Sequence, residues 1–236
     1  IDCGPVGFDG RGGHGHNDCL SFEAVLKNIQ LITDSGTFVY TEDFKWRNSF
    51  RSTSFHNTPR IDQAEINRFI GEDELFLLSD DAKPKLHSWK TGPEKDIFVG
   101  SHSGYERLGI GLRPVRTIVL DKMVHGLVVQ DEFEGDGIHQ ITIPFHFVAG
   151  ATLSKKNDYQ WHLSIGQNKF DLQIFELGEW KVEIGSGWVS ESYGIKTERA
   201  VLVFTHEGPL ASLTVGIRPD IKGSQKIDTW MKNILA

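Results

Sequence analysis

From about residue 96 onward the chain is a series of short apolar segments separated by turn-forming residues, and this spacing constrains the fold more than any other feature. The segments are rich in β-branched and aromatic residues and show hardly any helical period. Short strand-like stretches at regular spacing, with glycine-containing turns between them, predict an antiparallel sandwich or barrel. The stretches are residues 116–121, 126–133, 139–147, 159–166, 168–175, 180–185, 200–206 and 211–218.

We therefore expect one all-β domain over residues 1–236, an antiparallel β-sandwich with few or no helices. The C-terminal residues 228–236 could form a short helix. Five glycines within the first thirteen residues predict an irregular opening segment over residues 1–13. The chain opens on Ile1 rather than Met, from which we expect a processed or trimmed piece of a longer protein.

A hairpin is expected where two apolar stretches, residues 20–26 and 29–36, flank the pair Lys27-Asn28. The apolar spacing also fits one amphipathic helix. The β-leaning residues of both stretches, and a pair that can turn the chain, favour two strands.

The charge and cysteine content limit the classes of partner. A formal net charge of −7 argues against a general nucleic-acid binder, so a polyanion would need a local cluster of Arg and His to hold it. No apolar run approaches the roughly 18 residues that a membrane-spanning helix needs. Cys3 and Cys19 are too few for a disulfide framework, and they either pair in an oxidising compartment or remain two unrelated thiols.

Two histidines, His14 and His16, stand one residue apart in the stretch Gly-Arg-Gly-Gly-His-Gly-His-Asn-Asp. In an extended chain they would point to the same side, which favours metal binding, anion binding or proton transfer. Two histidines and one carboxylate form a familiar Zn²⁺ set that leaves a position for water. Asp18, Asp34 and His56 are the further candidates. The spacing alone also fits histidines that hydrogen-bond loop carbonyls.

A second polar segment, residues 46–63, carries three arginines together with His56 and Asn57. Such a segment is costly to bury without partners, although a solvated face with weak ion pairs is an alternative. Tyr40 and Tyr105 have packing as their default role, and so do most aromatic residues of the strands. An exposed Trp46 or Trp89 could stack on sugar rings.

Four ordered blocks resemble the heparinase II/III family of polysaccharide lyases, and more narrowly its C-terminal β-sandwich domain. They are Gly-His-Gly-His-Asn-Asp-Cys-Leu-Ser-Phe-Glu-Ala, Leu-Ile-Thr-Asp-Ser-Gly-Thr-Phe-Val-Tyr, Trp-Arg-Asn-Ser-Phe-Arg-Ser-Thr-Ser-Phe-His-Asn-Thr and Asp-Glu-Phe-Glu-Gly-Asp-Gly-Ile-His-Gln-Ile-Thr-Ile-Pro-Phe-His-Phe. The match covers roughly residues 10 to 150. The resemblance implies a supersandwich-like β fold.

The resemblance also implies the site. Carried over position by position, a structural Zn²⁺ would be bound by His16, Asp34 and His56, and His14 would take part in catalysis in the cleft beside it. Asp18 is the alternative carboxylate, because it would share a strand face with His16, and the residues alone do not separate it from Asp34. Arg51, which opens the Arg-Ser-Thr block, is expected as a structural or substrate-facing cation, and Asn57 is the other residue expected to contact substrate.

Members of the family cleave uronic-acid polysaccharides by β-elimination. The reaction needs a group that neutralises the uronate carboxylate, a base at C5 and an acid at the leaving oxygen. We expect His14 to serve as the base or to contact the carboxylate. The expected partners are the acidic polysaccharide and the N-terminal helical toroid of the family, which this chain lacks and which supplies further catalytic groups. The resemblance implies a periplasmic or secreted protein.

Two other functions remain open from the sequence. The first is a non-catalytic carbohydrate-binding or scaffold module in which a metal only holds the fold. The second is a cupin-like metal enzyme, since Gly-x-His-x-His also opens the cupin metal motif. A cupin needs a Glu a few residues later, and Glu23 lies seven residues past His16.

Overall fold

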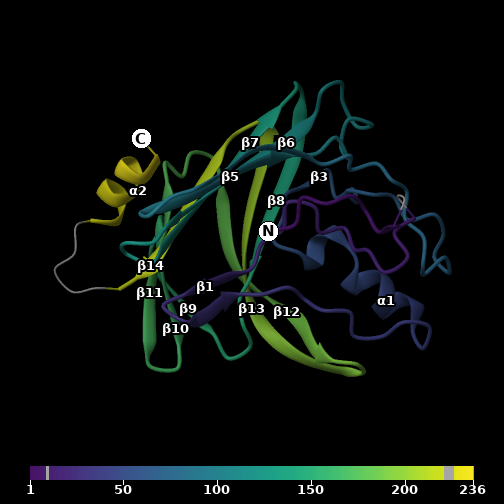
Figure 1. Cartoon of the computed structure of the whole chain (residues 1–236), viewed down its shortest axis with the longest axis horizontal. Coiled ribbons are helices and arrows are strands. Elements are labelled where there is room, and N and C mark those ends of the chain that lie inside the picture. The colour runs from purple at the N-terminus through teal and green to yellow at the C-terminus, as the bar shows by residue number, and fades with distance from the viewer. Residues whose placement is uncertain (9–10, 221–225, 236) are drawn as a thin grey trace.

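The computed structural model describes residues 1–8, 11–220 and 226–235. Within these residues, two antiparallel sheets pack around one apolar cluster, accompanied by a small hairpin and short helices (Figure 1). The eight-stranded sheet has the order β4 (Lys85–Thr91), β5 (Lys95–Ser101), β6 (Arg113–Asp121), β7 (Gly126–Glu134), β14 (Leu213–Pro219), β11 (Asn168–Phe175), β10 (Gln160–Ile165) and β9 (Thr152–Asn157). The four-stranded sheet has the order β12 (Lys181–Ser192), β13 (Ile195–Pro209), β8 (Ile138–His146) and β3 (Arg60–Ile61). The predicted β-sandwich is confirmed.

The core follows from the two-residue alternation of the strands. On β11, Phe170, Leu172 and Ile174 are all at most 1% exposed, whereas Asp171 and Phe175 are half-buried. Phe145 of β8 and Phe204 of β13 meet edge to face, with ring centroids 5.2 Å apart, in the same cluster. Inward-facing side chains from both sheets therefore interdigitate, as in other sandwiches.

The hairpin predicted around Lys27-Asn28 is confirmed as β1 (Ala24–Leu26) and β2 (Ile29–Ile32). Lys27 and Asn28 have φ values of 52° and 60°, which is the left-handed pair that a two-residue type I′ turn requires. An isolated bridge from Ile32 to Phe147 joins the hairpin to the end of β8. The hairpin thus fixes the chain that leads into the site.

Other elements lay outside the sequence prediction. Strand β4 precedes the expected series, and α1 (Phe44–Phe50) begins the polar segment, followed by the 3₁₀ turn η2 (Thr53–Phe55). Asp43 caps α1, because its carboxylate accepts hydrogen bonds from the backbone N–H groups of Lys45 and Trp46, both at 3.0 Å. Helix α2 (Ile227–Leu235) matches the expected C-terminal helix, whose last residue, Ala236, lies outside the described residues.

The opening segment contains no strand over residues 1–8 and 11–13, and Asp9 and Gly10 lie outside the described residues. Loops of the first eighty residues gather with α1 at one end of the molecule, and α2 lies at the other (Figure 1). Among the described residues, none of the helices has the length and apolar character needed to cross a bilayer. Cys3 and Cys19 both carry free thiols.

Candidate metal and catalytic site

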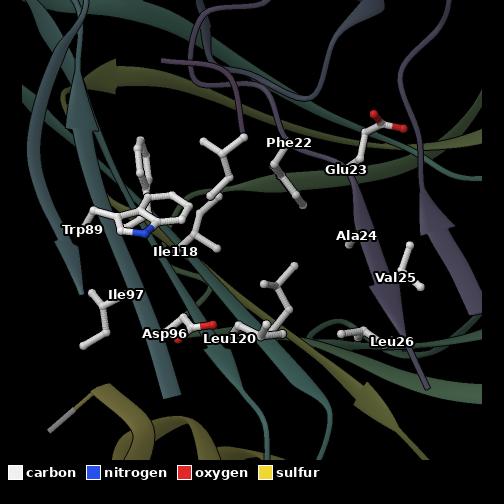
Figure 2. Close-up of a pocket in the computed structure, with 13 residues that line it drawn as sticks. Phe22, Glu23, Ala24, Val25, Leu26, Trp89, Asp96, Ile97, Ile118 and Leu120 are labelled. Atoms are coloured by element: carbon white, nitrogen blue, oxygen red, sulfur yellow. The ribbon is translucent and has the colours of Figure 1, made fainter. Parts of the chain in front are cut away.

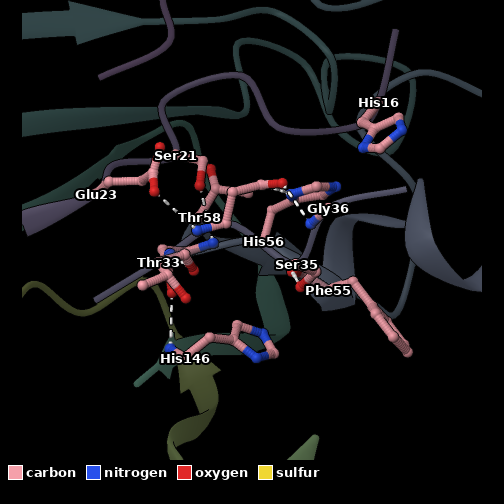
Figure 3. Close-up of polar contacts among 12 residues, drawn as sticks. His16, Ser21, Glu23, Thr33, Ser35, Gly36, Phe55, His56, Thr58 and His146 are labelled. Carbon is pink, nitrogen blue, oxygen red and sulfur yellow. Dashed lines mark hydrogen bonds and ion pairs between the residues drawn. The ribbon is translucent and has the colours of Figure 1, made fainter. Parts of the chain in front are cut away.

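Three side chains from two loops converge at the loop end of the sandwich. His16 and Asp18 precede the hairpin, and His56 follows η2; one potential ligand atom from each lies within 4.8 Å of the others. The rings of His16 and His56 have centroids 5.2 Å apart (Figure 3). No strand forms through the His-x-His stretch, so a loop conformation, rather than strand alternation, sets the orientation of these side chains.

Asp34 contacts the same cluster from the other side of His56. Its Oδ2 lies 2.8 Å from His56 Nδ1, and its Oδ1 accepts a hydrogen bond of 2.7 Å from the backbone N–H of Gly36. Gly36 has a φ of 74°, and a Cβ at this position would collide with the carbonyl oxygen of Ser190 on β12. The turn after Asp34 therefore requires glycine, and it seats the carboxylate against the imidazole.

The charges around the cluster have opposite effects on the two imidazoles. Burial and the neighbouring His56 lower the pKa of His16 to about 3, so its ring is neutral at physiological pH. Burial also lowers the pKa of His56, but the Asp34 carboxylate more than offsets this and leaves that pKa raised. Burial raises the pKa of the Asp18 carboxyl. A ligand that carries positive charge would relieve the burial cost of both carboxylates.

The free atoms of the cluster fit a Zn²⁺ ion. His56 Nε2 is buried and has no hydrogen-bond partner among the described residues. His16 Nε2 accepts a hydrogen bond from Arg47 at 3.0 Å, since a guanidinium only donates, and a metal bound at His16 would replace this bond. Two imidazole nitrogens and one carboxylate oxygen form a donor set that Zn²⁺ commonly takes. The geometry adds Asp18 to this set, while Asp34 contacts His56 through the other ring nitrogen.

Arg47 lies beneath this site on α1. Its Nη1 is 3.0 Å from His16 Nε2, and its guanidinium carbon lies 5.0 Å from the ring centroid of Tyr40. The side chain is fully buried, and its Nε and Nη2 have no hydrogen-bond partner among the described residues. A buried cation without a paired carboxylate makes the adjoining surface attractive to anions.

His14 is exposed, and it lines a cleft that also contains His16, Asp18 and Thr37. Its ring contacts Tyr40 and Phe76 edge-on, with centroids 5.7 and 6.0 Å away. His14 therefore faces the cleft, not the core, and a solvent-borne group can reach it.

Arg51 and Asn57 are buried instead of lining the cleft. Arg51 donates hydrogen bonds of 2.9–3.1 Å to the carbonyls of residues 74, 75 and 77. Asn57 Nδ2 donates to the carbonyls of Phe22 and Thr33, and its Oδ1 accepts from the backbone N–H of His146 at 2.7 Å. These donors are consumed by the loops, so the structure gives both residues a scaffold role in place of the expected substrate contact.

The tyrosine and tryptophan candidates separate by position. Tyr105 is buried and donates to the carbonyl of Pro59 at 2.9 Å, in keeping with its default packing role. Trp46 packs against Phe38 and Phe50 near α1. Trp89 is exposed on β4 and borders an apolar hollow between β1 and strands β4–β6, which contains no histidine (Figure 2).

Sequence reasoning did not single out Arg47, Phe76 or Glu65 for the site. Arg47 lies in α1 and Arg51, four residues later, is its C-cap residue, so their relation becomes visible only once the helix is known. Glu65 accepts hydrogen bonds from Ser52, Thr53 and Asn17 and holds η2 against the His-x-His loop. No periodicity of the sequence marks it.

The chain matches the family described as "Heparinase II/III-like, C-terminal" over residues 1–227. A crystal structure of a heparan sulfate lyase HepC mutant from Pedobacter heparinus superposes with a TM-score of 0.76 at 19% identity, covering 96% of this chain and 33% of that one. Two heparinase III structures give TM-scores of 0.75 and 0.72 at 20% and 19% identity, covering 94% and 92% of this chain and 32% of each of theirs. These likenesses show the fold. A comparison with curated proteins finds no match.

Proposed function

Because the chain belongs to the heparinase II/III-like C-terminal family of polysaccharide lyases, we propose that it is the C-terminal domain of an enzyme that cleaves a uronic-acid polysaccharide by β-elimination. One observation carries the proposal: an exposed histidine, His14, stands in a cleft beside two histidines and one carboxylate, His16, His56 and Asp18, that could hold a metal. Glu23, which a cupin-like site would need, is not part of that group.

The chemistry follows from the groups at the cleft. The C5 proton of a uronate is weakly acidic while the adjacent carboxylate keeps its charge, so a cation or hydrogen-bond donor must stabilise the developing negative charge. His14 accepts the C5 proton or contacts the carboxylate, since an imidazole accepts protons near neutral pH. The positive charge of Arg47 beneath Tyr40 favours an anionic sugar in this cleft.

The proposed zinc would be held by His16 and His56 with Asp18 or Asp34 as the carboxylate. When bound, the ion supplies a structural cross-link between loops that are distant in the chain. His16, two residues from His14, would then hold the catalytic loop in one conformation. In the alternative with Asp18 as ligand, Asp34 orients the His56 ring through Nδ1.

The chain spans about a third of the length of the lyase structures it resembles. We propose that an N-terminal helical domain of the whole protein supplies the remaining catalytic groups, including the acid at the leaving oxygen. The proposed substrate class is a uronate-containing glycosaminoglycan such as heparan sulfate, and the proposed location is periplasmic or secreted.

The whole enzyme tests this proposal by the absorbance of the new C4–C5 double bond. His14→Ala should lower turnover about 100-fold or more, because it removes a proton-transfer group, while metal content measured by elemental analysis stays unchanged. His16→Ala and His56→Ala should lose the metal. Turnover unaffected by His14→Ala, or glycan binding without turnover in the metal-loaded wild type, would favour a non-catalytic binding module.

Asp18→Asn and Asp34→Asn separate the two carboxylates. Replacing the carboxylate that binds the metal should abolish binding of one metal ion per chain. Replacing a carboxylate that only orients His56 should weaken the metal affinity about 10–100-fold but still allow one ion per chain at saturation. Freshly purified wild type without bound metal would contradict the zinc proposal.

A further inference from the structure

A row of aromatic rings leads away from His14 along the loop end of the molecule. Tyr40 contacts His14, Phe76 lies 6.1 Å from Tyr40 at an interplanar angle of 20°, and Tyr193 lies 6.1 Å from Tyr40 at 24°. The distances join ring centroids. Three nearly parallel rings thus extend from the proposed catalytic group to the turn between β12 and β13.

These rings are open to solvent. Phe76 is 40% exposed, Tyr193 is 59% exposed and Tyr40 is half-buried. Centroid separations of 6.1 Å fit an offset arrangement, in which neighbouring rings do not cover each other's faces. Exposed aromatic faces of this kind are costly in water unless a partner covers them, and the C–H faces of pyranose rings are a suitable partner.

The hairpin that presents Tyr193 is fixed in place. The backbone N–H of Gly194, the next residue in its turn, donates to the carbonyl of Phe38 at 2.8 Å. Lys196, two residues further, lies over the rings of Trp46 and Trp188, with Nζ 2.9 and 4.7 Å from their centroids. Cation–π contacts therefore hold the hairpin tip against α1. Tyr193 is a positioned side chain at the end of a long strand pair.

Two cations lie near the row. Arg47 lies 5.0 Å from the Tyr40 ring and keeps two buried nitrogen atoms without a partner among the described residues. Lys196 lies beyond Tyr193 in the chain and is half-buried. A chain with a net charge of −7 carries these positive charges beside exposed rings, which fits a ligand with both apolar ring faces and negative charge.

We propose that Tyr40, Phe76 and Tyr193 form a glycan subsite that binds sugar units next to the one at His14, with Arg47 and Lys196 attracting the carboxylate or sulfate groups of that chain. This inference rests on the proposed function, because it takes the ligand to be the acidic polysaccharide substrate. It adds a binding surface on the β12–β13 hairpin, about two ring contacts from the catalytic histidine. Longer oligosaccharides should therefore bind more tightly than short ones.

The test measures binding of this protein to a size series of heparan sulfate oligosaccharides, with a parallel series from an unsulfated uronate polymer, by isothermal titration calorimetry. Tyr193→Ala should weaken binding of the longer oligosaccharides roughly tenfold and leave that of the shortest unchanged. Tyr193→Phe, which preserves the ring, should restore most of the affinity. A loss confined to the sulfated series would identify sulfate as the group that the cations attract.

Tyr159→Ala is the matched control, because Tyr159 is a tyrosine of similar exposure, 51%, in the turn between β9 and β10. It should leave binding of every length unchanged. Equal binding by wild type and Tyr193→Ala would overturn the subsite and leave the proposed function standing. No binding of either series by the metal-loaded wild type would overturn the proposed substrate class together with the subsite. Unchanged melting temperatures of the variants exclude misfolding as the cause.

Discussion

The sheets and the loops of the first eighty residues both bury side chains completely, but the side chains differ in kind. In the eight-stranded sheet the buried groups are mainly apolar, such as Leu163 and Leu172, both fully inaccessible. In the loops that carry the site, fully buried groups include Arg47, Arg51 and His56. Apolar burial needs only shape, whereas each buried polar atom needs a partner at a fixed distance and angle. The conformation of the loops therefore depends on hydrogen bonds. A few buried polar atoms of the site, such as His56 Nε2, have no partner among the described residues, and a ligand could bind there.

One residue joins the two regions. Arg116 of β6 forms a two-pronged ion pair with Asp131 of β7, with nitrogen–oxygen distances of 2.7 and 2.8 Å, and both side chains are at most 1% exposed. The same guanidinium donates to the carbonyls of Leu20 and Asn57 in the loops. The sheet thus supplies a buried donor that seats both site-bearing loops, and the chemistry at one end of the molecule depends on the register of β6 and β7.

The largest effect is expected from Asn57→Ala. The variant leaves the carbonyl of Phe22 and the backbone N–H of His146 without their partner and removes one of two donors to the carbonyl of Thr33, which keeps Arg199. Each buried group without a partner costs about 1–3 kcal/mol, so we expect a loss of about 3–5 kcal/mol in the free energy of unfolding. Urea denaturation measures it. Leu172→Ala is the comparison from the sheet, with an expected loss of about 2–5 kcal/mol from cavity formation. A loss below about 1 kcal/mol for Asn57→Ala would show that the loops are not specified by this residue.

An intermediate effect is expected from pH acting on His102, which follows β5. Burial, together with Arg116 and Arg107, lowers its pKa to about 3 from an ordinary value of 6.5. As the pH falls below 6.5, the unfolded chain takes up a proton on His102 that the folded protein does not. The free energy of unfolding therefore keeps its full value above pH 6.5 and decreases as the pH falls from 6.5 towards 3, by up to about 1.4 kcal/mol per pH unit.

His102→Asn should reduce this acid sensitivity. Asparagine keeps an acceptor for the backbone N–H of Gly104, which bonds His102 Nδ1 at 3.1 Å, but it does not titrate. Urea midpoints measured between pH 7 and pH 4 give the slope of stability for both proteins. Identical slopes would contradict the role of His102.

The smallest effect is expected at the hairpin turn. Alanine tolerates a φ of 60° less well than asparagine does, so Asn28→Ala should lower the free energy of unfolding by about 1 kcal/mol. Asn28→Gly should lower it less or not at all, because glycine adopts this φ freely. Thermal unfolding of the two variants makes the comparison. Because Asn28 is exposed, packing does not change with either substitution.

Much of the sandwich could be read from the sequence because strand alternation and turn residues are local signals. The hairpin at Lys27-Asn28, strands β6–β8 and strands β10–β14 follow from them, whereas β5 and β9 were not among the expected stretches. Helix α1 was missed because its seven residues, which include Arg47, show no clear apolar period, and because its start depends on the cap by Asp43. β4 was missed for a related reason: as an edge strand with mostly exposed residues it lacks an apolar face.

The site was predictable in its residues more than in their roles. His16 and His56 were expected to meet, and they do. Arg51 and Asn57 were expected to face substrate, and both are buried. A polar side chain in a loop can point inward or outward, and the choice depends on which backbone groups elsewhere need a partner. The spacing of residues in the sequence does not indicate which distant backbone groups those are.

By itself the sequence determined an all-β sandwich and a hairpin before the polar segment, and it supplied the histidines and carboxylates proposed to bind a metal, because periodicity and residue chemistry act over short distances. Only the tertiary structure decided that Asp18 and Asp34 approach His56 from different sides, that Arg47 lies under Tyr40, and that the tip of the β12–β13 hairpin brings Tyr193 beside them. These contacts join segments up to about 150 residues apart, and their geometry is set by packing of the whole chain.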